Sequence, residues 1–328
     1  MATPSSYRAP PWLRNPHLQS VLGSSLPRRA MAARALAATG AVTTTHVVDG
    51  GDGVRLQGLS STVPGRRPLG LALLLHGWEG SADSTYMRLS AARLLARGFD
   101  VFRLNFRDHG GTHHLNEGIF HSCLIDEVVH AAGDIARRFQ PDPSAPLRVG
   151  GYSLGGNFAL RLGLRAPAAG LAVAKIAAVC PVLDPAETMT AMERGFPLYA
   201  WYFRRKWTRS LRRKQALFPN LLALDDRTLG LDLRPLTGWL VERHTDFGHI
   251  DRYFDGYANA GDRLAALSVP ADILTSTDDP VIPVSGFDAL RLSPTTRLEV
   301  AAHGGHCGFL LDARLRGFAE HWIADRLA

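Results

Sequence analysis

The chain has 328 residues, of which 46% are hydrophobic and 20% are charged, and its formal net charge is +7. We expect a cytoplasmic protein, because no apolar run reaches the ~18 residues of a membrane span and the first residues lack a secretory signal. The charge does not indicate a nucleic-acid partner, since eight basic residues and no acidic ones lie between Arg194 and Leu224, and the remainder is close to neutral. The three cysteines have neither metal-ligand nor CxxC spacing, and their odd number argues against a disulfide framework.

The first part of the chain predicts a segment packed on a core, followed by a hairpin. Residues 1–30 are interrupted by prolines and irregular in pattern, and we expect residues 1–40 to form an irregular or helical segment that packs on the core. Residues 42–60 alternate Thr, Val and Leu about a glycine-rich turn, which predicts two strands of an antiparallel hairpin.

From residue 69 onward, strand and helix patterns alternate. Strands are predicted at 69–75, 100–106, 146–153, 174–182, 271–279 and 296–303, and helices at 81–97, 123–139, 155–166, 286–292 and 314–327. Such alternation predicts an α/β fold with a mostly parallel sheet and helices on both faces. Residues 185–262 break the rhythm and are aromatic and basic, so we interpret them as an inserted helical cap between core segments 41–184 and 263–328.

The stretch "GGYSLGG" (residues 150–156) contains the pattern G-x-S-x-G between a predicted strand and a predicted helix. A nucleophile elbow needs this setting, because the glycines permit a cramped backbone that lifts the serine above the sheet. A glycine-rich turn with an incidental serine is the alternative. The context favours Ser153 as a nucleophile.

A serine hydroxyl needs a base, and the base needs a carboxylate to orient it. In this type of fold the order along the chain is Ser, Asp, His. Asp278 and Asp279 follow one predicted strand, and His303 and His306 follow the last one. We prefer Asp279, which directly precedes Pro-Val, and His306, which lies in a glycine-flanked loop.

Acyl transfer also needs two N–H groups that stabilise the developing oxyanion. We expect the backbone of Leu154 to provide one and that of Trp78, in "LLLHGWEGS", to provide the other. The residues that we expect to contact substrate flank these elements, belong to the cap, or lie in the loop after strand 100–106, which we expect to line the mouth of the active site; they are His76, Gly77, Tyr152, His109, Trp201 and Phe203.

Six motifs occur along the chain in a characteristic order: "RNPHLQS", "LLLHGWEGS", "NFRDHGGT", "GYSLGGN", "TDDPVIP" and "HGGHCGF". In these motifs and their order, the chain from about Trp12 onward resembles the YheT-like group of the α/β-hydrolase superfamily. The resemblance implies a carboxylic ester hydrolase with the triad Ser153, Asp279 and His306; esterases, lipases and acyltransferases occur among its relatives. Asp108 departs from the NFRG that is common there, which bears on the acyl-acceptor side of the pocket rather than on the triad.

Two features suggest a metal site or a membrane contact in addition to ester hydrolysis. His109, His113, His114 and His121 lie near acidic residues but match no zinc motif, so we predict neither a metal nor another cofactor, and the His121–Asp126 spacing is a weak acyltransferase pattern. In residues 196–214, Tyr199, Phe203, Trp207 and Leu211 share one helical face flanked by arginines. This helix could cover an acyl pocket, contact an anionic membrane, or do both.

We therefore expect a serine hydrolase that acts on a small-molecule ester with an apolar acyl chain. The alternatives are an alcohol O-acyltransferase with the same triad and a non-catalytic binding module on the same fold.

Overall fold

The computed structural model describes residues 2–142 and 144–328, and within them one nine-stranded sheet has the order β1-β9-β8-β7-β6-β4-β5-β3-β2. Its strands are β1 (Thr3–Pro4), β2 (Val42–Asp49), β3 (Arg55–Thr62), β4 (Leu71–Leu75), β5 (Asp100–Asn105), β6 (Leu147–Tyr152), β7 (Val173–Val179), β8 (Ala271–Ser276) and β9 (Thr296–Ala301). In this sheet order, all neighbouring strands from β1 through β9, β8, β7, β6 and β4 to β5 are parallel, whereas β3 is antiparallel to both β5 and β2. The predicted mostly parallel sheet with an N-terminal hairpin is confirmed.

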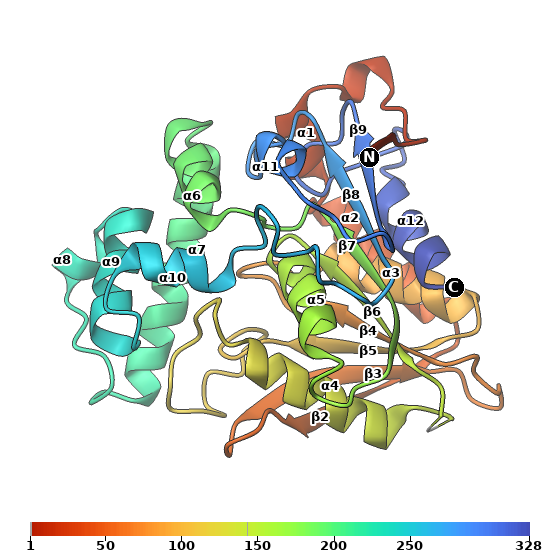
Figure 1. The fold of residues 1–328 in the computed structure, drawn as a ribbon, viewed down its shortest axis with the longest axis horizontal. Helices are drawn as coiled ribbons and strands as arrows, with labels where there is room; N and C mark the ends of the chain where they lie inside the picture. The colour runs from red at the N-terminus through yellow and green to blue at the C-terminus, as the bar shows by residue number, and fades with distance from the viewer. Residues whose placement is uncertain (1, 143) are drawn as a thin grey trace.

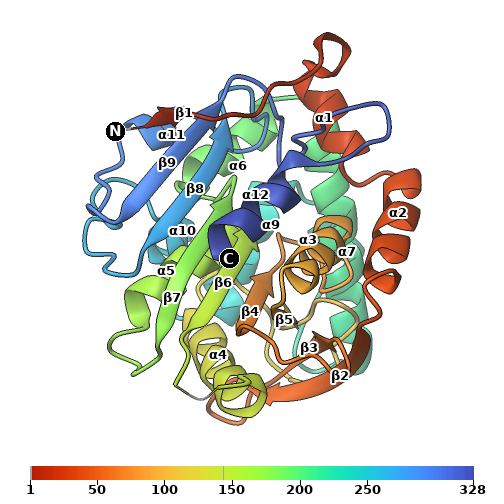
Figure 2. The same ribbon diagram turned by 90° about the vertical axis from the view of Figure 1, so that its right-hand side faces the viewer.

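Helices cover both faces of the sheet because its central strands are apolar on both sides. In β4, Leu73 and Leu75 pack into one core, while Ala72 and Leu74 pack into the other. Helices α3 (Thr85–Ala96) and α12 (Phe318–Leu327) cover the second core, and α4 (Ile125–Phe139) and α5 (Leu154–Arg165) cover the first (Figure 2). The sheet thus forms the middle layer of three.

The N-terminal residues are largely helical. A 3-10 turn (Pro11–Leu13) precedes α1 (Pro16–Leu22) and α2 (Leu26–Ala37), and α2 packs outside α3. Of the two alternatives expected for this segment, the helical one applies from Pro16 onward, because Pro16 occupies the first turn of α1 and the Asn15 side chain accepts hydrogen bonds from the backbone N–H groups of His17 and Leu18. Proline here begins a helix rather than preventing one.

Between β7 and β8 the chain leaves the sheet for a set of helices that gather on one side of it (Figure 1). They are α6 (Pro185–Arg194), α7 (Leu198–Leu217), α8 (Asp226–Leu229), α9 (Leu233–His244) and α10 (Ile250–Tyr257). Tyr199, Trp207 and Leu211 of α7 are buried, so the apolar face of this helix packs inward.

Two predicted helices are shorter than expected. Helix α11 (Ser285–Asp288) ends four residues before the predicted boundary at 292, and α12 begins at Phe318 rather than at residue 314. Residues 310–317 form a turn instead, because the Asp312 carboxylate accepts from the N–H groups of Arg314 and Arg316 and a bridge joins Leu310 to Gly317.

Candidate active site

Ser153 lies at a strained turn between β6 and α5. Its φ of +53° and ψ of −119° form a combination that L-residues rarely adopt. The flanking glycines are needed because a Cβ on Gly151 would lie 2.1 Å from the Gly155 carbonyl oxygen, and one on Gly155 would lie 2.2 Å from that of Leu75. The close approach of turn, helix and neighbouring strand leaves no space for a side chain at either position.

The side chains of Ser153, His306 and Asp279 form a hydrogen-bonded chain at the carboxyl ends of β6, β9 and β8. His306 Nε2 lies 2.9 Å from Ser153 Oγ, and His306 Nδ1 lies 2.9 Å from Asp279 Oδ2. Because a carboxylate only accepts, Nδ1 carries the hydrogen and Nε2 of the neutral ring is free to accept the serine proton. Burial disfavours the charged imidazole, but Asp279 and Cys307 together outweigh burial, through their charges and hydrogen bonds, and raise the pKa of His306 well above its usual value.

Asp279 is held in its acceptor role by the backbone. Its side chain is fully buried, and Oδ1 accepts from the N–H groups of Val281 and Ile282 at 2.8 and 2.9 Å. The neighbouring pair is separate: Asp278 lies 3.3 Å from His303 and accepts from the N–H of Gly305. Asp278 therefore supports the loop that carries His306, and Asp279 contacts the imidazole itself.

The N-terminal segment also supports this loop, which the sequence did not indicate. Ser20 Oγ accepts from the backbone N–H of His306 at 2.8 Å, and the Gln19 side chain accepts from the N–H of Leu310. A Cβ on Gly305 would lie 2.3 Å from the Pro16 carbonyl oxygen. The available signal was "RNPHLQS", which we used for the resemblance without assigning it a role.

Among the backbone N–H groups near Ser153, those of Trp78 and Leu154 have no acceptor within the described part of the chain. Leu154 is the first residue of α5, where N–H groups lack intrahelical partners. The loop that carries Trp78 is adjacent, since a Cβ on Gly77 would lie 3.3 Å from Ser153 Cβ. Both groups are thus available to a ligand at Ser153.

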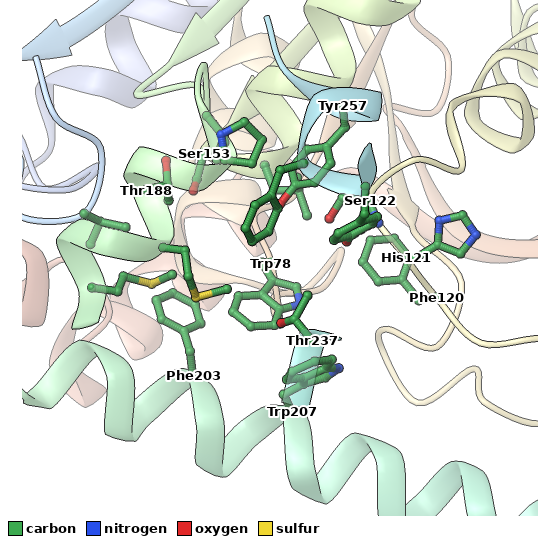
Figure 3. Close-up of a pocket in the computed structure, with 18 of the residues that line it drawn as sticks. Trp78, Phe120, His121, Ser122, Ser153, Thr188, Phe203, Trp207, Thr237 and Tyr257 are labelled. Carbon is green, nitrogen blue, oxygen red and sulfur yellow. The ribbon is translucent and has the colours of Figure 1, made fainter. Parts of the chain in front are cut away.

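A cavity of about 790 Å³, its open mouth included, extends from Ser153 under the inserted helices. In Figure 3, Phe203 and Trp207 rise from one helix toward Trp78, and Ser153 lies across the cavity. The Phe203 ring stacks on Trp78 at 5.1 Å, and the Trp207 ring meets Trp78 edge-on at 5.5 Å. The lining is mostly apolar; residues that we had not singled out as substrate contacts include Phe120, Val182, Met189, Met192, Leu240, Tyr253, Tyr257 and Ile282.

Of the six expected substrate contacts, Phe203 lines the cavity, and Gly77 lies beside Ser153 in the loop before Trp78. The other four do not line the cavity, because they are buried in hydrogen bonds within the fold or lie on its surface. His76 is fully buried and bonds to the Gly77 carbonyl, and the Tyr152 hydroxyl bonds to Ser90 on the opposite face of the sheet. His109 accepts from the N–H of Glu79, and Trp201 is 52% exposed outside the cavity.

The histidines of the loop after β5 do not converge. His113 pairs with Ser210, while His121 contributes to the cavity wall. Asp126 lies in the first turn of α4, points outward and pairs with Arg165 at 3.6 Å. The His121–Asp126 spacing therefore does not bring the two side chains together here.

Asp108, the departure noted in the sequence, forms a buried ion pair with the insertion. Lys214 Nζ of α7 lies 2.8 Å from Asp108 Oδ1, and both side chains are at most 7% exposed. Burial raises the pKa of Asp108 and lowers the pKa of Lys214, in each case against the pull of the partner. The Asp108–Lys214 ion pair thus links α7 to the core of the protein beside the cavity.

These features define a protein of the α/β-hydrolase class. A family model described as the alpha/beta hydrolase fold matches residues 72–313, and the chain belongs to this family. The "Putative esterase YheT" of Escherichia coli (strain K12) is 27% identical over 281 residues, which cover 78% of this chain and 74% of that protein. The resemblance to the YheT-like group is thus confirmed.

Solved structures share the fold at low sequence identity. A hyperthermophilic esterase from Pyrobaculum calidifontis aligns with a TM-score of 0.58 at 16% identity, covering 99% of this chain and 98% of that one. An esterase of Pyrococcus furiosus aligns with a TM-score of 0.55 at 16% identity, covering 88% and 89%. Within the described residues, none of the helices combines the length and the apolar character needed to cross a bilayer.

Proposed function

We propose that this chain is a serine esterase that cleaves carboxylic esters with an apolar acyl chain. The observation that carries the proposal is the unbroken Ser153–His306–Asp279 hydrogen-bond chain at the mouth of an apolar cavity. The esterase names of the relatives support the general reaction.

In the proposed mechanism, Ser153 Oγ attacks the ester carbonyl carbon while His306 Nε2 takes its proton. Asp279 holds the ring and stabilises the imidazolium, and the N–H groups of Trp78 and Leu154 bind the oxyanion. His306 then protonates the leaving alcohol, which departs and leaves an acyl-enzyme. Water, deprotonated by His306, attacks the acyl carbon, and the acid and free Ser153 are released.

Paired variants test this assignment. His306→Gln and Ser153→Ala should each reduce turnover of p-nitrophenyl esters by at least about 10³-fold, whereas the matched change His303→Gln in the same loop should have less than about a tenfold effect. Fluorophosphonate labelling should depend on Ser153. Equal losses at His303 and His306, or labelling that survives Ser153→Ala, would reject the mechanism.

We further propose that the start of α7 contacts anionic lipid. Phe196, Leu198, Trp201 and Tyr202 are 36–52% exposed, and the Arg205 guanidinium lies over the Trp201 ring. Exposed aromatic side chains beside an excess of basic ones favour an anionic interface. The opposite face of the same helix lines the cavity, so this contact would bring lipid-like esters close to Ser153.

Vesicle co-sedimentation at low salt tests this contact. Wild type should bind vesicles of anionic lipid more than neutral ones and should dissociate as salt rises. Trp201→Ala should weaken binding, while Leu69→Ala, which removes an apolar side chain with 68% exposure at the amino end of β4, should not. Binding that is absent, or equally affected by both variants, would refute the proposal.

A further inference from the structure

Two cysteines lie beside the imidazole ring of His306. Cys180 directly follows β7, and Cys307 follows His306 in the loop after β9. Their sulfur atoms and one nitrogen of His306 all lie within 4.8 Å of one another, and Cys307 Sγ is 4.0 Å from Nε2. Elsewhere in the described residues, no other three His, Cys, Asp or Glu side chains gather in this way.

We propose that Cys180, Cys307 and His306 form an inhibitory binding site for a thiophilic divalent cation such as Zn²⁺. Two thiolates and one imidazole are ligands that Zn²⁺ favours, with bonds of about 2.3 Å to sulfur and about 2.0 Å to nitrogen. Donors around such an ion are roughly 3.5–4 Å apart, so the three groups need to approach one another by at most about 1.3 Å.

The surroundings favour this binding. Neither thiol has a short hydrogen bond, since Cys180 Sγ lies 4.0 Å from the Gly305 carbonyl oxygen and Cys307 Sγ lies 3.9 Å from that of Val179. His306 donates from Nδ1 to the Asp279 carboxylate, so that in the neutral ring Nε2 is the unprotonated nitrogen. A carboxylate behind a histidine in this way is a common support for zinc ligands.

Binding and catalysis would exclude each other, and this consequence rests on the proposed esterase function. As each Zn–S bond forms, the thiol releases its proton to water, and the Nε2 lone pair forms the third bond. That lone pair can then no longer accept the Ser153 proton. No bond of the substrate is involved and no group is oxidised, so a chelator should restore activity.

Cobalt titration of the full-length protein tests the site independently of catalysis. Co²⁺ should bind one per chain with a thiolate-to-cobalt band in the near ultraviolet, and Zn²⁺ should displace it. Cys180→Ser and Cys307→Ser should each weaken binding at least about tenfold, while Cys123→Ser, the matched control, should not. Serine keeps the size and the Cβ at both positions, where φ is +45° and +59°. The absence of the band, or a band that persists in both variants, would overturn the site.

The inhibitory effect is tested on p-nitrophenyl butyrate. Zn²⁺ should inhibit wild type reversibly. With activity expressed relative to each protein's own rate without Zn²⁺, Cys307→Ser should need at least about tenfold more Zn²⁺ for half inhibition. Equal sensitivity of the two proteins would refute inhibition through this site. Ser153→Ala should still give the cobalt band, so a failure of the esterase proposal is distinguishable from a failure of the metal site.

Discussion

Replacing Lys214 with methionine should destabilise the protein strongly, because it removes one partner of a buried pair. Lys214 Nζ donates to the Asp108 carboxylate at 2.8 Å and also to the backbone carbonyls of His113 and Asn116. Lys214→Met would leave a buried carboxylate without a counter-charge and two carbonyls without this donor. Loss of one member of such a pair costs about 3–5 kcal/mol of unfolding free energy.

The partner substitution should be milder. Asp108 has a φ of +60°, a conformation that asparagine tolerates well, and an amide oxygen can still accept from the N–H of Phe120. Lys214 would keep both backbone acceptors. We expect Asp108→Asn to cost about 1–3 kcal/mol, and the double variant to cost less than the sum of the two single changes.

Urea unfolding and ester kinetics together measure the effect. Because α7 carries Phe203 and Trp207 into the cavity, Lys214→Met should also raise KM for long-chain esters more than for acetate esters. Arg212→Met is the control on the same helix, since its pair with Asp226 is exposed and should contribute less than about 1 kcal/mol. If the unfolding free energy of Lys214→Met is within about 1 kcal/mol of the wild-type value, the buried pair does not hold α7 in place.

Three further predictions concern the elbow, acid stability and the cavity. Gly155→Ala should cost more than about 3 kcal/mol or prevent folding, because its Cβ would collide with backbone atoms of β4, whereas Gly238→Ala in α9, where the space is open, should raise the melting temperature. Burial lowers the pKa of His109 and of His113 from 6.5 to about 4, so the unfolded chain binds these protons first. Stability should therefore fall from about pH 6.5 to pH 4, by up to about 3 kcal/mol per imidazole, and a melting temperature that is flat over this range would contradict it. Met192→Trp should fill the cavity and lower kcat/KM for octanoate esters relative to acetate esters, and an unchanged ratio would show that the acyl chain lies elsewhere.

The central fold could be predicted because its signals are local. Continuous apolar runs, helical spacing and the glycines around Ser153 each depend on neighbours in the chain. Parallel strands then bring residues at their carboxyl ends together, which is why Asp279 and His306 could be selected as partners of Ser153 before the structure was known. The choice between Asp278 and Asp279 needed only their different positions relative to Pro280.

The remaining features depend on contacts between distant segments, which a single sequence does not encode visibly. Asp108 pairs with Lys214, which lies 106 positions further along the chain. Ser20 bonds to the backbone of His306, which lies 286 positions away. The cavity lining draws on several helices whose relative orientation no periodicity specifies. His76 and Tyr152 were assigned to substrate because they neighbour reactive residues in sequence, although adjacent residues of a strand point to opposite faces.

The support of the His306 loop by Ser20 has a consequence for how the protein is made. A ribosome produces helix α1 early, but the loop that it holds emerges only 286 residues later. Ser153 and its elbow can form well before this point, while His306, the proposed base, has no fixed position. The nascent chain therefore passes through a long interval in which the proposed nucleophile is present without the proposed base, and the proposed hydrolytic activity should arise only after residue 306 has been made.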